Sequence, residues 1–154
     1  MSGFPKSHAV RIVLSACCLL CSCATVPDDE GILQYQVQGD AIVRPLTSTP
    51  GDPARGRIVV SGRDGNCLLC HAIPETGERF MGNVGPPLSH VASRLTDGQL
   101  RLRVVDPTRV NREVAMPAYH RIDALDGVAE SYRAKPILTA QQVEDVVAYL
   151  LTLH

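Results

Sequence analysis

The chain has 154 residues, of which 45% are hydrophobic, 15 are Lys or Arg and 16 are Asp or Glu. This length holds one globular domain with tails and leaves little room for a second domain. The formal net charge of −1 at pH 7 lacks the basic excess typical of nucleic-acid-binding proteins, so we expect no nucleic acid partner.

Residues 1–22 have the features of a bacterial export signal. Lys6 and Arg11 give a positively charged start, and residues 12–20 form a short apolar core. This run is shorter than the roughly 20 residues that a membrane-spanning helix needs. Its removal leaves 13 basic and 16 acidic residues, a net charge of −3. We therefore expect the mature protein in the periplasm.

The end of this signal places a cysteine where a lipid could be attached. Residues 20–23, Leu-Cys-Ser-Cys, resemble a bacterial lipobox, in which Cys23 would be acylated and become the first mature residue. Conventional cleavage after the small residues 22–24 is the competing interpretation. Lipidation is favoured because Cys67 and Cys70 belong to the motif described below, which would leave Cys23 as an unpaired thiol. A lipid there would hold the protein on a membrane face.

Residues 23–51 are expected to form a linker or arm ahead of the folded domain. They are polar and rich in turn-forming residues, including three prolines. Residues 33–37 alternate apolar side chains with glutamines, which is the period of a strand that packs on another surface, and Gly39-Asp40 predicts a turn. The segment is either a solvated tether or an arm that augments a partner protein.

The folded domain is expected to span residues 52–154 and to begin with a helix. Asp52 is a good N-cap and Pro53 suits the first helical position. Gly62 and Gly65 are expected to end this helix.

The next segment, Cys67-Leu68-Leu69-Cys70-His71, is the signature of covalent haem attachment. The thiols of Cys67 and Cys70 add across the haem vinyl groups, and the adjacent His71 then reaches the iron from the proximal face. A thioredoxin-type redox pair or half of a zinc site are the alternatives. Without the predicted signal the chain has no second cysteine pair, and it has no βαβ pattern, which argues against both.

Residues 85–88, Gly-Pro-Pro-Leu, form a rigid loop after this motif. Its carbonyl groups, with that of Pro86 as the candidate, are available to accept the second ring N–H of His71. Such a bond would fix the tautomer and the ligand strength of the histidine. The alternative is a loop without a role.

Two helices are predicted in the middle of the domain. Over residues 88–95, apolar side chains fall at i, i+3, i+4 and i+7 and form one stripe. Thr96 and Gln99 have the spacing of a capping box for the next helix, which Asp106-Pro107 would end. The exposed face of this helix is expected to be rich in arginine.

A haem held by one histidine needs a sixth iron ligand, and Met116 is the preferred candidate. Met116-Pro117 follows in a loop between helices, where a thioether can approach the distal face and the proline stiffens the loop. His120 is the second candidate, although a lone histidine is more often a surface residue. Met81 lies too close in sequence to the proximal ligand. The remaining candidates are His90 and His154.

The last helix gives the clearest signal in the chain. Thr139 and Gln142 form a capping box, Leu138 and Val143 a hydrophobic staple, and apolar residues recur along one face to Leu151. No strand-rich segment follows residue 50. The predicted fold is therefore all-α.

These features together resemble the class I cytochromes c over residues 52–154. The resemblance rests on the N-terminal helix with Gly56, the haem-attachment motif, the Gly-Pro-Pro-Leu loop, Met116-Pro117 and a C-terminal helix with Tyr149. It implies the class I cytochrome c fold with one covalent haem c.

Within this class, five segments are similar to the SoxX family, the monohaem subunits of the sulfur-oxidation cytochrome SoxAX: GDPARGR (51–57), GNVGPPL (82–88), DPTRVN (106–111), MPAY (116–119) and PILTAQQVEDVVAYL (136–150). The resemblance implies a heterodimer with SoxA, whose cysteine-ligated haem joins thiosulfate oxidatively to a cysteine of the carrier SoxYZ. It implies His71 and Met116 as axial ligands. A lipid on Cys23 would depart from the usual soluble form.

On this interpretation the chain passes electrons from the partner to a downstream acceptor and has no catalytic residue of its own. The complex would act as an L-cysteine S-thiosulfotransferase. The alternative is a stand-alone periplasmic electron carrier of a respiratory chain. A peroxidase or ligand sensor is a third hypothesis, which would require an open sixth position at the iron.

Overall fold

Three α-helices form the framework of the domain: α1 (Pro53–Ser61), α2 (Asp97–Val105) and α3 (Ala140–Leu150). The computed structural model describes residues 1, 3 and 35–154. Within them no strand occurs, apart from an isolated bridge between Gln38 and Ala41. Short 3₁₀ turns lie in the connections, at Cys67–Leu69, Pro74–Thr76, Val91–Ser93, Pro107–Arg109 and Glu130–Tyr132. The predicted all-α class is confirmed.

Two predictions about the N-terminal region lie outside this part of the chain. Cys23 and nearly all of the predicted signal at residues 1–22 are not among the described residues. Of the helices that the structure describes, none combines the length and the apolar character needed to cross a bilayer.

All three helices begin at the residues that the sequence predicted. The Asp52 side chain accepts a hydrogen bond from the Arg55 backbone N–H at 2.9 Å, and Pro53 occupies the first turn of α1. The capping boxes at the starts of α2 and α3 are both complete, with Thr96 and Thr139 as their N-caps. Each box satisfies backbone N–H groups that have no partner within the helix.

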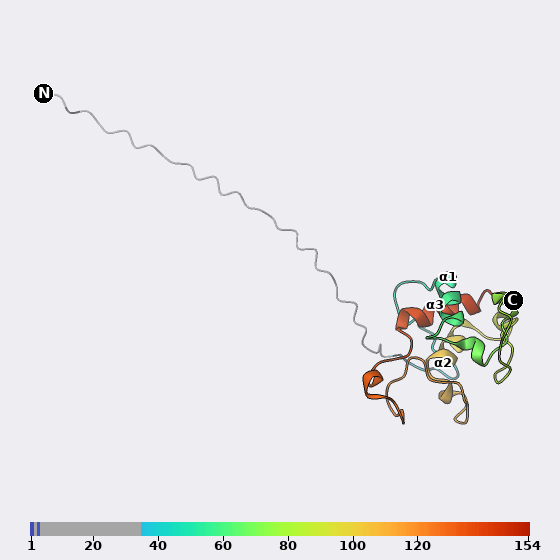
Figure 1. The fold of residues 1–154 in the computed structure, drawn as a ribbon. Helices are drawn as coiled ribbons and strands as arrows, with labels where there is room; N and C mark the ends of the chain where they lie inside the picture. The colour runs from blue at the N-terminus through green and yellow to red at the C-terminus, as the bar shows by residue number, and fades with distance from the viewer. Residues whose placement is uncertain (2, 4–34) are drawn as a thin grey trace.

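Helix α1 crosses α3 at close range, and the two lie side by side in Figure 1. Gly56 makes this approach possible, because a Cβ at this position would lie 2.8 Å from the Tyr149 Cβ and even closer to the backbone of Asp145. Helix α3 turns Val143, Val146 and Val147 into the core, where each is at most 2% exposed. The predicted apolar stripe therefore packs as expected.

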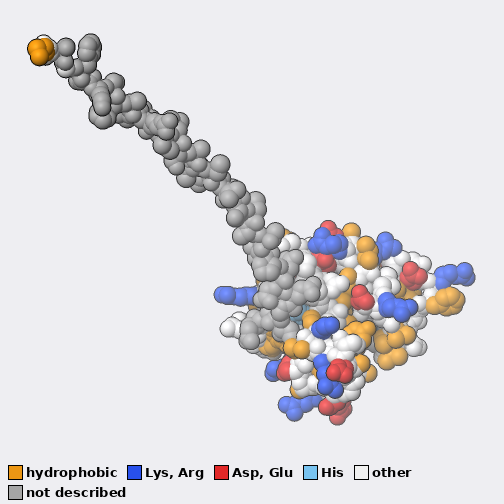
Figure 2. Space-filling view, turned by 60° about the vertical axis from the view of Figure 1, so that its left-hand side comes forward, with side chains coloured by type: hydrophobic (Ala, Val, Ile, Leu, Met, Phe, Trp, Pro, Cys, Tyr) orange, Lys and Arg blue, Asp and Glu red, His pale blue; other side chains and the backbone are white. Residues whose placement is uncertain are grey.

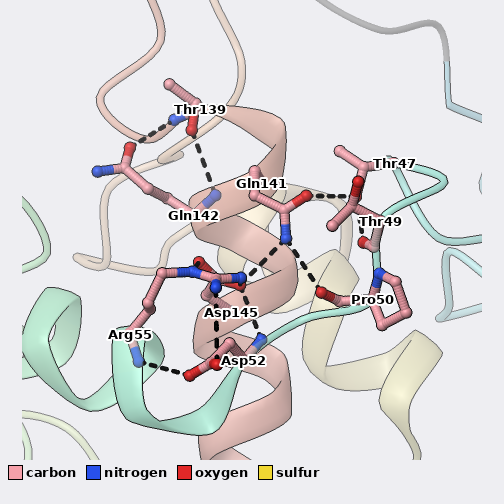
Figure 3. Close-up of polar contacts among 9 residues, drawn as sticks. All are labelled: Thr47, Thr49, Pro50, Asp52, Arg55, Thr139, Gln141, Gln142 and Asp145. Atoms are coloured by element: carbon pink, nitrogen blue, oxygen red, sulfur yellow. Dashed lines mark hydrogen bonds and ion pairs between the residues drawn. The ribbon is translucent and has the colours of Figure 1, made fainter.

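A buried carboxylate joins the start of α1 to α3 (Figure 3). The Asp145 side chain is 4% exposed. It accepts hydrogen bonds from the Asp52 backbone N–H at 2.8 Å, from the Arg55 guanidinium at 2.8 Å and from the Gln141 amide at 3.1 Å. Gln141 in turn contacts Pro50 and Thr47. The network fixes the segment before α1 on α3.

This network predicts a pH-dependent contribution to stability. Burial alone would raise the pKa of Asp145, but the hydrogen bonds from Arg55, Asp52 and Gln141 outweigh burial and hold it below its usual value. A carboxylate with a lowered pKa stabilises the fold above its unfolded pKa of about 3.9. The contribution is lost as the pH falls through the folded value.

We therefore expect Asp145→Asn to lower the urea midpoint of unfolding clearly at pH 6 and by much less at pH 3. Urea titrations of both proteins at the two pH values measure this difference. Asp126→Asn serves as a control because this side chain is exposed. An equal loss at both pH values would contradict the lowered pKa of Asp145.

Part of the segment predicted as a linker or arm belongs to the folded domain. Ile42 is 1% exposed, and its backbone N–H donates to Gly98 O at 2.9 Å. The Leu46 N–H donates to Glu144 Oε1 at 2.8 Å. The alternative of a solvated tether is therefore wrong for residues 41–50, because Ile42 and Leu46 belong to the core and hold this segment on α2 and α3. The predicted turn at Gly39-Asp40 is present, and Gly39 has a φ of 61°.

Two predictions about the middle of the domain are also corrected. Residues 88–95 do not form the predicted α-helix and contain only the 3₁₀ turn Val91–Ser93. His90 has a left-handed φ of 58°, which interrupts the helical path. The apolar stripe nevertheless faces inward, and Val91 is buried. On α2, Arg101 does not belong to an exposed arginine face. It is 3% exposed and pairs with Glu144 at 2.8 Å.

Candidate functional site

The predicted attachment residues lie in one tight turn that follows α1. Asn66 takes a left-handed conformation with a φ of 45°, which asparagine tolerates better than most residues, and starts the turn. The N–H groups of Cys70 and His71 both donate to Cys67 O, at 3.1 and 2.9 Å. Both cysteines are free thiols. The turn therefore brings two thiols and an imidazole together.

The Cys67 thiol does not have the properties of a redox-active cysteine. Burial raises its pKa to about 11. Redox-active cysteines in Cys-X-X-Cys motifs instead have lowered pKa values that favour the nucleophilic thiolate. This argues against the thioredoxin-type alternative.

His71 is oriented by the loop at residues 82–88. Its Nδ1 lies 2.7 Å from Pro86 O. A carbonyl oxygen can only accept, so Nδ1 carries the proton and Nε2 is left with a lone pair for a metal. The loop is fixed to the attachment turn, because the N–H of Gly85 donates to Cys70 O and that of Gly82 to Leu68 O, each at 2.8 Å.

Gly85 is required by the closeness of this loop to the histidine. A Cβ at this position would lie 2.6 Å from His71 Nδ1 and even closer to Cε1. Only glycine lets the loop carbonyl reach the imidazole ring without displacing it.

The candidates for a sixth ligand differ in what already binds them. Met81 Sδ accepts a hydrogen bond from the Ile73 N–H at 3.1 Å. His120 is 1% exposed; its Nδ1 contacts Leu138 O at 2.8 Å, and its buried Nε2 has no hydrogen-bond partner among the described residues. His90 and His154 are exposed. Met116 is half-buried against the core, and its sulfur takes part in none of the hydrogen bonds found among the described residues.

The loop that carries Met116 is anchored at both ends. At its start, the buried Asp106 accepts from the Thr108 N–H at 3.2 Å and pairs with Arg121 at 3.1 Å. At its end, the N–H groups of Tyr119 and His120 donate to Val104 O and Val105 O, the last residues of α2. Residues 107–118 thus form a closed loop at the end of α2.

Tyr119 is a residue of this site that the sequence alone did not single out. Its hydroxyl donates to Gly65 O at 2.7 Å in a buried position. Burial raises the pKa of its phenol, and the nearby Cys67 and Cys70 raise it further. The phenol therefore lies beside the attachment turn. Its position in the MPAY segment, three residues after Met116, is the sequence feature that could have indicated its place in the site.

The donor set and its surroundings fit a covalent haem c. Two thiols and an oriented imidazole share one turn, and the Met116 thioether, which makes no hydrogen bond among the described residues, lies in a closed loop. Several apolar side chains that pack on the core stay only partly buried: Leu68, Leu88, Leu95 and Met116. Incompletely covered apolar side chains of this kind suit the edge of a large apolar group.

The comparisons with known proteins agree with this geometry. The family model of cytochrome c matches residues 55–154. Among solved structures, a chain of SoxXA from P. pantotrophus is similar, with 32% sequence identity and a TM-score of 0.73. The match covers 80% of this chain and 96% of that chain. No curated protein matches the sequence.

Proposed function

This chain belongs to the cytochrome c family and is a SoxX-like cytochrome, and from this we propose that it is the electron-transfer subunit of a SoxAX-type complex. The observation that carries the proposal is the match over 96% of a SoxXA chain at 32% identity. Nearly all of that chain therefore has a counterpart here. The partner would be a SoxA-like cytochrome.

The described residues have separate roles in this proposal. Cys67 and Cys70 would hold haem c through thioether bonds, and the His71 imidazole and the Met116 thioether would bind its iron. Pro86 O keeps the imidazole in one tautomer. When bound, the haem supplies an iron that takes up and releases one electron at a time.

With both His71 and Met116 bound to the iron, the haem of this chain would serve electron transfer alone. The chain itself would then have no catalytic residue, and the chemistry would take place on the partner. We propose that the complex acts as an L-cysteine S-thiosulfotransferase, which oxidatively joins thiosulfate to a cysteine of a SoxYZ-type carrier. This subunit would pass the released electrons to a downstream acceptor.

Exposed apolar side chains around the attachment turn support an obligate partner. Leu69, Phe80 and Val84 are 67%, 89% and 75% exposed. Backbone hydrogen bonds at Gly82 and Gly85 hold their loops together beside the motif. Among the coloured residues in Figure 2, charged side chains of both signs lie between apolar ones on the surface of the domain. Large exposed apolar groups favour a stable interface over the weak contacts of a diffusing carrier.

A pull-down from thiosulfate-grown cells tests this proposal. The tagged, haem-loaded protein is expected to recover a second, SoxA-like cytochrome in a near-equal amount, as identified by mass spectrometry. Recovery of the chain as a monomer, reduced by respiratory donors alone, would favour the stand-alone electron carrier instead.

We further propose a periplasmic location with a lipid anchor on Cys23, on the basis of the export signal and the lipobox-like sequence. Cys23→Ser is expected to abolish incorporation of labelled fatty acid in growing cells. Cys21→Ser is the matched control and should keep the label, because Cys21 would leave with the signal. Unchanged labelling of the Cys23→Ser variant would refute the anchor.

A further inference from the structure

Tyr119 ends the Met116 loop and makes contacts in three directions. Its backbone N–H donates to Val104 O at 3.1 Å, and its carbonyl accepts from the Leu138 N–H at 2.8 Å. The residue is 8% exposed. The backbone thus fixes this end of the loop to the end of α2 and to the segment before α3.

The Tyr119 hydroxyl makes a contact of a different kind. It reaches Gly65 O, 54 positions earlier and two residues before Cys67, at 2.7 Å. In the part of the chain that the structure describes, no other hydrogen bond joins residues 107–120 to residues 62–72. This one hydroxyl therefore connects the loop of the sixth-ligand candidate with the turn of the proximal ligand.

We propose that the Tyr119 hydroxyl is a positioning group that keeps the Met116 loop closed over the attachment turn and so shields the sixth position of the iron from external ligands. The inference rests on the proposed axial role of Met116. Removing the hydroxyl leaves the buried Gly65 O with only a 3.7 Å contact to the Cys67 sulfur, which cannot donate a hydrogen bond once it forms a thioether, and this destabilises the closed loop. Opening of the loop would then be more frequent, while the backbone anchors at Val104 and Leu138 remain.

Imidazole, a small external iron ligand, is a direct probe of loop opening in the ferric holoprotein. Its apparent dissociation constant equals the intrinsic constant divided by the fraction of open molecules. We expect Tyr119→Phe to bind imidazole about tenfold more tightly than the wild type, which corresponds to ~1.4 kcal/mol. The titration is followed by the haem absorption spectrum and needs no electron-transfer assay.

Tyr149→Phe is the matched control. Tyr149 is also buried, but its hydroxyl has no hydrogen-bond partner among the described residues. Its removal should leave imidazole binding unchanged. Urea unfolding of both variants shows whether each is folded under the titration conditions.

Met116→Ala in the same series separates the two assignments. If this variant keeps the wild-type spectrum and imidazole affinity, Met116 is not the ligand. The ligand assignment and the proposed role of the Tyr119 hydroxyl then both fail. If it changes the spectrum while Tyr119→Phe binds imidazole as Tyr149→Phe does, the ligand assignment stands and the role of the hydroxyl is refuted. Tighter imidazole binding in Tyr119→Phe, but not in Tyr149→Phe, supports the proposed role of the Tyr119 hydroxyl.

Discussion

Replacing Cys67 and Cys70 together by serine is expected to abolish covalent haem attachment completely. Both thiols lie in one turn with His71 and form no disulfide with each other, and the two thioether bonds to the haem need both sulfur atoms. Haem staining after denaturing electrophoresis measures the covalent fraction. The stained band should disappear, and each single variant should lose one of the two bonds.

Leu69→Ala is the matched control for this experiment. Leu69 lies between the two cysteines, is 67% exposed and contributes no thiol. Its removal should leave the stained band at wild-type intensity. Covalent haem in the double serine variant would show that the attachment site lies elsewhere in the chain.

Glu144→Gln is expected to lower the free energy of unfolding by about 3–5 kcal/mol. The carboxylate accepts from Arg101 Nε at 2.8 Å and Nη2 at 3.0 Å, and the side chains are only 6% and 3% exposed. The neutral amide would leave the buried guanidinium with the exposed Asp97 carboxylate, 3.6 Å away, as its remaining ion-pair partner. It would also weaken the contact to the Leu46 N–H. Urea unfolding monitored by far-ultraviolet circular dichroism measures the loss.

Two further variants define the cause of this effect. Glu113→Gln removes an exposed carboxylate and should change stability by less than about 0.5 kcal/mol. The double variant Arg101→Met, Glu144→Leu removes both buried charges and should recover most of the stability lost in Glu144→Gln. A Glu144→Gln protein as stable as Glu113→Gln would contradict a structural role for the pair.

Local sequence signals predicted the helix starts correctly because the partners are close in sequence. Asp52, Thr96 and Thr139 each cap backbone groups within three residues. The spacing of Cys67, Cys70 and His71 is equally local. Residues 88–95 show the limit of such patterns, since a stripe of apolar residues also arises when a bent loop turns them inward around His90.

The features that sequence did not predict depend on contacts between distant segments. Arg101 has the pattern of a solvated helix residue until Glu144, 43 positions later, pairs with it in the core. Likewise, residues 41–50 contain turn formers typical of a linker, yet α2 and α3 offer an apolar surface that buries Ile42 and Leu46. The Tyr119 contact with Gly65 spans 54 positions, and no local period indicates it.

The most direct test of the proposed electron-transfer role is thiosulfate-dependent reduction of this haem in a reconstituted system. The ferric protein is mixed with its co-purified SoxA-like partner and a SoxYZ-type carrier, and the absorbance of reduced haem c is followed after thiosulfate is added. We predict reduction in the complete mixture and none when the partner or the carrier is left out. A haem that stays oxidised in the complete mixture, yet is readily reduced by a respiratory donor, would contradict the proposed function.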